Sequence, residues 1–184
     1  MDILKEFDIN TDSLCRIKDG NIFINKNFIK VTATKYYENL VIEKISSFEE
    51  SSKLLLFKHL YQYDNSQHYL LSSKSEYRIL ISKMRLSDHN LLIEKGRHLK
   101  IPRDQRLCTT CKIVDNEQHF ILHCKNNSIP RETYLDFIKQ EKKDFINMED
   151  DQKLIYILNP STPTQVNKLG SFIKQSYALR TGGS

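Results

Sequence analysis

Four side chains that commonly bind metal ions lie close together in the second half of this 184-residue sequence. Cys108 and Cys111 form a C-x2-C pair, His119 and Cys124 form an H-x4-C pair, and seven residues separate the two pairs. A turn between the first two cysteines lets both thiolates reach one ion, and a single helical turn brings the second pair to the same point. Three thiolates and one imidazole complete the tetrahedral shell that zinc prefers, and a closed shell of four protein ligands is typical of structural sites. The sequence therefore predicts one structural zinc ion and no catalysis by it.

Alternative interpretations of these residues are weaker. A C-x2-C pair also occurs in redox dithiols, but no βαβ pattern surrounds this one. His123 is an alternative ligand, yet adjacent residues rarely both reach one ion, so we expect Cys124 inside the shell and His123 outside it. Cys124 as a buried thiol with His119 on the surface is disfavoured by the four-ligand spacing. Cys15 stands alone and is expected to be a small buried hydrophobic residue.

Positive charge is concentrated just before these ligands. Residues 74–112 contain ten Lys and Arg against four acidic residues, an excess of six positive charges in a chain whose net charge is +5. Such a regional excess favours an anionic partner, although a run of charge also occurs on ordinary solvated helix faces. We expect seven of these cations to share one exposed surface beside the zinc: Arg78, Lys83, Arg85, Lys95, Arg97, Arg103 and Arg106.

The elements that must position these residues are mainly helical. Apolar residues recur at helical spacing over 75–86, 131–143, 150–158 and 165–180, and only 5 Gly and 4 Pro occur in the chain. Ser46 and Glu49 have the spacing of a capping box for a further helix. Ser87 and Asp88 are expected to cap another short helix, with Gly96 at its C-terminal end. We predict a small, mainly α domain with one zinc knuckle.

The sequence suggests three regions. Residues 1–45 are an N-terminal segment in which Asp19-Gly20-Asn21 favours a minor β-hairpin, while a helix over 28–45 is the competing prediction. Residues 46–180 form the helical zinc-knuckle domain, and residues 181–184 are a linker-like tail. No apolar run is long enough to span a membrane, so we expect no membrane partner. The first residues show no signal peptide, so an intracellular location, nuclear or cytoplasmic, is expected.

The residues around the knuckle resemble a known family. The segments Arg85–Arg97, Ile101–Cys111 and Asn116–Cys124 are similar to the zinc-binding region that follows the reverse transcriptase domain in animal non-LTR retrotransposons. The resemblance covers about residues 50–180, and its specific part is the knuckle with the Glu-Lys-Gly-Arg block upstream. It implies that the four ligands are Cys108, Cys111, His119 and Cys124. It also implies RNA or DNA, and a reverse transcriptase or other retroelement protein, as partners.

The sequence also departs from that family. No paired Asp motif of a polymerase palm is present, and about sixty residues follow the knuckle without the acidic pattern of a nuclease. Asp88-His89-Asn90 with His98 superficially suggests an HNH-type nuclease, but that chemistry needs a ββα unit, and a helix start at Ser87-Asp88 explains the same residues. We therefore expect no enzymatic activity. The expected function is zinc-stabilised nucleic-acid binding, and the alternative is a zinc-stabilised scaffold that binds protein.

Overall fold

The computed structural model describes residues 15–18, 21–24, 26–47, 55–61, 70 and 74–181. The chain divides into two units, one ending at Glu49 and one beginning at Glu50. The first unit contains strands β1 (Cys15–Lys18) and β2 (Asn21–Ile24) and helix α3 (Lys26–Ser46). The two strands pair antiparallel, with Cys15 opposite Ile24. The minor hairpin and the competing helix predicted for this region are therefore both present, one after the other. The expected burial of Cys15 concerns a side chain outside the described part.

Helix α3 ends where the sequence suggested that another helix begins. Ser46 is its last residue, and the Ser47 hydroxyl donates to the Lys44 carbonyl oxygen at 2.7 Å. A serine hydroxyl bonded to a carbonyl three residues earlier stabilises a helix end, not a helix start. Ser46 is thus part of α3, and the predicted capping box stays untested, because Glu49 and the residues after it lie outside the described residues. The next described helix starts at Leu55.

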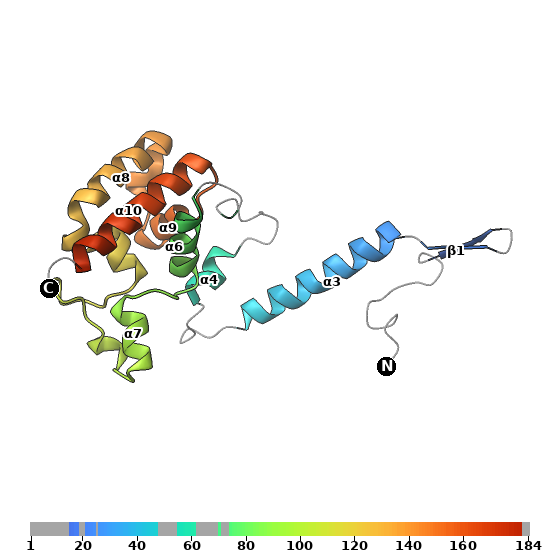
Figure 1. Cartoon of the computed structure of the whole chain (residues 1–184), viewed down its shortest axis with the longest axis horizontal. Coiled ribbons are helices and arrows are strands. Elements are labelled where there is room, and N and C mark those ends of the chain that lie inside the picture. Colours follow the sequence, from blue (N-terminus) through green and yellow to red (C-terminus); the bar gives the residue numbers. More distant parts are fainter. Residues whose placement is uncertain are drawn as a thin grey trace. The chain divides into compact units, whose positions relative to one another are not determined.

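The second unit is helical, as Figure 1 shows, and confirms the mainly α fold class. None of the helices in the described segments is long and apolar enough to cross a membrane. The elements follow one another as α4 (Leu55–Leu60), α6 (Ser75–Arg85), α7 (Leu92–His98), η1 (Arg103–Gln105), η2 (His119–His123), η3 (Lys125–Asn127), α8 (Ser128–Glu141), η4 (Lys143–Asn147), α9 (Asp150–Leu158) and α10 (Pro163–Thr181).

Helix α10 is the centre of the packing, with α6 on one side and α8 on another. Phe172 of α10 stacks on Tyr134 of α8 with ring centroids 5.2 Å apart, and it also contacts Phe120 of η2. Phe120 and Ile121 are fully buried in the same hydrophobic core. Because these two residues lie between His119 and Cys124 in the sequence, the core itself holds the second pair of predicted ligands in place.

Arg85 is not on the surface, which corrects its place in the predicted basic set. It is 1% exposed and lies on the inner face of α6 with Ile81 and Met84. Its guanidinium donates to the carbonyl oxygen of Leu158 and to the side chain of Asn159, at the end of α9. A buried cation must be hydrogen-bonded, and here it satisfies a helix C-terminus, where positive charge is favourable. Arg85 therefore links α6 to α9 and cannot belong to an exposed patch.

Helix α7 begins later than the sequence suggested. Its first residue is Leu92, whose N–H donates to Asp115 at 2.9 Å, so a distant carboxylate caps this helix in place of Ser87 or Asp88. Ser87 has a left-handed backbone with φ of 49°. Gly96 lies inside α7 and does not end it; a Cβ there would approach the Arg106 side chain to 2.6 Å. The glycine is needed so that Arg106 can pack against the helix.

Gly170 of α10 provides a test of the α6–α10 contact. A Cβ atom at this position would overlap Cβ and Cγ of Tyr77, which the backbone of α6 holds in place. Overpacking of this kind costs about 1–3 kcal/mol, whereas replacing glycine by alanine in a helix gains at most about 1 kcal/mol. We therefore expect Gly170→Ala to lower the thermal unfolding temperature. Asn167→Ala, at an exposed position of the same helix, is the control, and a Gly170→Ala variant as stable as the unmodified protein would contradict the packing described here.

Candidate metal centre

The segment that carries His119 and Cys124 is a single π-helical turn. The Cys124 N–H donates to the His119 carbonyl oxygen at 2.7 Å, which is an i→i+5 bond, and η2 spans His119–His123. In an ordinary α-helix, residues five apart point to different sides, because one turn takes 3.6 residues. The wider π turn, closed by an i→i+5 bond, brings residues i and i+5 nearer to the same side, so it suits the H-x4-C spacing. Such turns are rare and occur often at functional sites.

The first pair of cysteines sits on a tight hairpin. Leu107 and Val114 form an antiparallel bridge, and inside it the Cys108 N–H donates to the Ile113 carbonyl oxygen at 2.8 Å. The Lys112 N–H donates to the Cys108 carbonyl oxygen at 2.9 Å, and Lys112 has a left-handed φ of 61°. This closed turn brings the side chains of Cys108 and Cys111 to the same side of the hairpin.

The side chains of the C-x2-C pair and of the H-x4-C pair lie close together. The ligand atoms of Cys108, Cys111, His119 and Cys124 all lie within 4.8 Å of one another, and the Cys108 and Cys124 sulfurs are 4.0 Å apart. Ligands 2.3 Å from a tetrahedral ion are somewhat less than 4 Å from each other, so this separation fits one shared ion. Cys108, His119 and Cys124 are buried, and Cys111 is partly exposed. These four residues are therefore close enough to bind a metal ion.

The imidazole of His119 is in the state that a metal ligand requires. Both ring nitrogens are buried and neither has a hydrogen-bond partner among the described residues. The His119 N–H of the main chain donates to the Asn116 side chain at 2.8 Å, which fixes the start of the turn. Burial lowers the pKa of His119 below its ordinary value of 6.5 and so favours the neutral ring. A neutral imidazole with an unpaired buried nitrogen fits a metal ion, because coordination would satisfy that nitrogen.

Two polar groups outside the four ligands approach the sulfurs. The Lys125 N–H of the main chain lies 3.3 Å from the Cys111 sulfur. The Arg180 guanidinium, in the last turn of α10, donates to the Cys124 sulfur at 3.1 Å. Three thiolates around a divalent ion leave one net negative charge, which these donors stabilise. Donors of this kind around a metal site orient the ligands and tune affinity.

Asp115 holds Arg180 in position. The Arg180 guanidinium donates to both carboxylate oxygens of Asp115, at 2.9 and 3.1 Å, and lies over the Phe120 ring, 4.7 Å from its centroid. Asp115 is buried, and it raises the pKa of Arg180 against the opposing effect of burial. The same carboxylate accepts the N–H that begins α7. The sequence alone did not identify Asp115 or Arg180 as supports of the ligand cluster. The signal that could have found them is Asp115 itself, an acidic residue between the two ligand pairs, close to a segment rich in cations.

The residues offered as alternatives lie elsewhere. His123 is exposed, and its Nε2 pairs with Asp150 at 2.8 Å, outside the four-ligand cluster. The expectation that His123 is not a ligand is therefore consistent with the geometry. His89, named for a nuclease, is buried: its Nε2 bonds Glu117 at 2.8 Å and its Nδ1 accepts the Leu91 N–H at 3.3 Å. With both ring nitrogens engaged, His89 is not placed to contact a substrate.

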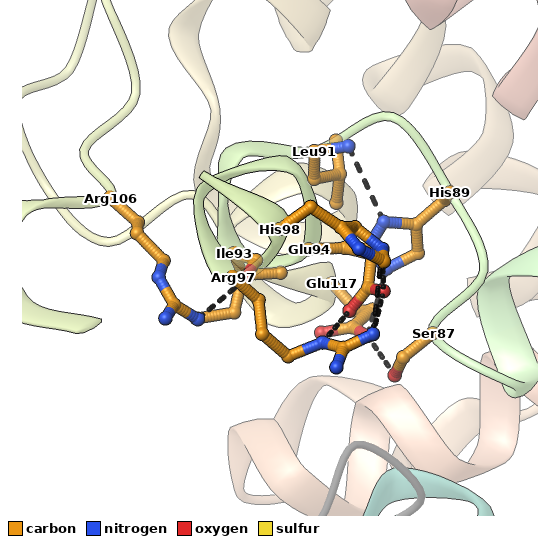
Figure 2. Close-up of polar contacts among 9 residues, drawn as sticks. All are labelled: Ser87, His89, Leu91, Ile93, Glu94, Arg97, His98, Arg106 and Glu117. Atoms are coloured by element: carbon orange, nitrogen blue, oxygen red, sulfur yellow. Dashed lines mark hydrogen bonds and ion pairs between the residues drawn. The ribbon is translucent and has the colours of Figure 1, made fainter. Parts of the chain in front are cut away.

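Figure 2 shows the polar network around α7. Glu117 accepts hydrogen bonds from Ser87 and His89 through its Oε1 atom. Although burial raises the pKa of Glu117, the hydrogen bonds and charge of His89 and the Ser87 hydroxyl outweigh it, so the pKa is lowered. Glu94, also buried, pairs with Arg97 at 2.7 Å and with His98 at 3.0 Å. The bonds to Glu117 connect the turn before α7 to the segment that leads into η2, whereas the Glu94 pairs lie within α7.

The seven predicted basic residues do not form one exposed surface. Lys83, Lys95, Arg97 and Arg103 are exposed, Arg78 and Arg106 are partly buried, and Arg85 is buried. Arg97, Arg103 and Arg106 line one cavity of about 350 Å³, whereas Arg78 and Lys83 line a second, shallower hollow on α6. The Arg106 guanidinium is fixed by the carbonyl oxygens of Ile93 and Ile101, both at 2.8 Å. Arg103 has no ion-pair partner within the described part of the chain.

Comparisons with known proteins give no relative for this arrangement. No family model matches the chain, and neither the curated proteins nor the solved structures contain a significant match.

Arg180 gives a prediction about the metal centre. Replacing it by Met keeps most of the apolar stem but removes the donor to the Cys124 sulfur and the partner of Asp115. Loss of such a supporting contact lowers metal affinity by about 10–100-fold. We expect Arg180→Met to lose its metal to a competing chelator at a correspondingly lower chelator concentration. Lys174→Met is the control, since it removes a positive charge from the same helix at an exposed pair with Glu76. Equal resistance of both variants to the chelator would rule out this role.

Proposed function

We propose that this chain is a nucleic-acid-binding module whose fold is stabilised by one zinc ion at Cys108, Cys111, His119 and Cys124. The observation that carries the proposal is the position of Arg97, Arg103 and Arg106 around one cavity, on the segment that leads into the four-ligand cluster. The ion would hold the hairpin and the π turn together, and Arg103 and Arg106 would contact phosphate groups.

The choice of zinc rests on the donor set. Three thiolates and one imidazole are soft and intermediate ligands, which suit zinc and not calcium or magnesium, whose ligands are oxygens. The four protein ligands complete a tetrahedral shell and leave no position for a substrate, so the ion's contribution would be to folding. Binding of structural zinc contributes about 10–16 kcal/mol, comparable with the total stability of a domain, about 5–15 kcal/mol.

The proposal that the partner is a nucleic acid rests on positive charges that no carboxylate of the described residues neutralises. Arg106 is held by two main-chain carbonyl groups, and neither it nor Arg103 forms an ion pair with an acid in the described residues. Lys95 is exposed on the neighbouring helix α7. Arginine guanidinium groups bind phosphate through two parallel hydrogen bonds, and fixed side chains lose little entropy on binding. The resemblance to retrotransposon proteins supports the same partner and is itself part of the proposal.

Zinc removal is the first test. We expect the purified protein to contain about one zinc ion per chain. Chelation, or the substitution Cys124→Ser, should unfold the segment from Leu107 to Asn126 and lower the thermal unfolding temperature, because metal binding at such a site is coupled to folding. Elemental analysis and thermal unfolding with and without chelator measure both effects. A protein that loses its metal without any change in unfolding would contradict a structural role.

Nucleic-acid binding is the second test. Lys95 and Arg103 are the residues to change, since Arg97 and Arg106 also hold Glu94 and two carbonyl groups inside the protein. The Lys95→Ala/Arg103→Ala variant should bind single-stranded RNA or DNA more weakly for every sequence. The slope of log affinity against log salt should fall by about 1.4 if both cations contact phosphate.

The matched control is Lys139→Ala/Lys143→Ala, which removes the same charge from exposed positions on α8 and η4. If both double variants behave alike, the contacts are not localised at α7 and η1. If the unmodified protein binds no nucleic acid at low salt, the protein-scaffold function becomes the better interpretation.

A further inference from the structure

The cavity beside Arg103 and Arg106 has two chemically different sides. Its volume is about 350 Å³, within the range of small-molecule sites, which is about 300–1,000 Å³. It is lined by residues of α4, α7, η1 and α9 and of the segment that leads into η2. Leu56, Ile93 and Ile155 line it with apolar surface and pack against the main core. The arginines line it with positive charge.

The arginine side is built for a fixed anion. Arg106 donates its Nε and Nη1 hydrogens to main-chain carbonyl groups, so its orientation is set before any ligand arrives. Its stem packs on Gly96, where even a methyl group would come within 2.6 Å of Arg106 Cγ. A cation held so rigidly without a carboxylate partner in the described residues is a preorganised site for a phosphate or carboxylate.

The same cavity carries hydrogen-bond acceptors. Glu117 lines it and uses Oε1 for both Ser87 and His89, so Oε2 has no side-chain partner among the residues described. The amide side chains of Asn116 and Gln118 and the carboxylate of Asp151 also line it, and Asp151 accepts a hydrogen bond from Gln118 at 3.1 Å. A ligand that fits has a flat apolar body with N–H donors at one end and an anionic group at the other.

We propose that this cavity takes one unpaired nucleotide of a bound strand, with its phosphate at Arg103 and Arg106 and its base against Leu56, Ile93 and Ile155. The inference rests on the proposed nucleic-acid function and adds a preference to it. A base inside a duplex cannot reach a cavity of this kind, because its edges are paired and its faces are stacked. The protein should therefore bind single strands, or unpaired ends and loops, in preference to a duplex of the same sequence.

Filling the cavity tests the proposal. Gln118→Trp and Ile155→Trp place an indole in the cavity from two different segments, the residue before η2 and helix α9, and leave every arginine in place. Each should weaken binding of a ten-nucleotide single strand at least tenfold and leave binding of the matching duplex unchanged. Ile129→Trp adds an indole at an exposed position of α8 that does not line the cavity, and should bind both like the unmodified protein. Metal content and thermal unfolding of each variant confirm that the fold is intact.

A mononucleotide completes the test. Adenosine monophosphate should bind the unmodified protein and compete with the single strand, and Arg103→Ala should weaken this binding. If the filled variants bind single strand and duplex as the unmodified protein does, or lose both equally, the cavity proposal fails while nucleic-acid binding through surface phosphates stands. If a short peptide with a free C-terminal carboxylate displaces the strand and adenosine monophosphate does not, the cavity is a peptide site. No binding of either nucleic acid would overturn both proposals.

Discussion

The ion pair between Asp115 and Arg180 is the contact on which the arrangement around the metal centre depends. Asp115 lies between the two ligand pairs, caps the start of α7 through the Leu92 N–H, and fixes the guanidinium that reaches the Cys124 sulfur. Asp115 is buried and Arg180 is partly buried, so removing Arg180 would leave a buried carboxylate without its charge partner, which is strongly destabilising. One carboxylate thus joins the hairpin of the first two cysteines to α7 and to the end of α10.

The hydrophobic core reinforces this connection. Phe120 lies inside the π turn, contacts Phe172 and Tyr177 of α10, and carries the Arg180 guanidinium on its ring. The residues between the ligands are therefore core residues, and their packing fixes where His119 and Cys124 lie in the fold. A metal ion at this site would add its binding energy to a turn that is already part of the helical domain, and loss of the ion would disturb α10 as well as the knuckle.

The cations of the basic segment divide by role. Arg85 satisfies the end of α9, Arg97 neutralises the buried Glu94, and Arg106 supports the main chain around α7. Arg103 and Lys95 have no such task in the described residues. A regional excess of charge is thus partly structural. Within the described residues, the cations left to bind an anion are those without a carboxylate partner: Lys95, Arg103 and the fixed Arg106.

The sequence by itself determined the mainly helical fold, the boundaries of α6 and α9 to within a residue, and the four residues that meet at the metal centre. Apolar periodicity and ligand spacing are local patterns, so they can be recognised in the sequence without knowing how the helices pack. Tertiary structure decided what depends on distant partners. The cap of α7 comes from Asp115, 23 residues away; the space for Arg106 comes from Gly96; and the burial of Arg85 depends on the end of α9. Such contacts correspond to no recognisable residue spacing in the sequence, because the two residues come together only when the helices pack.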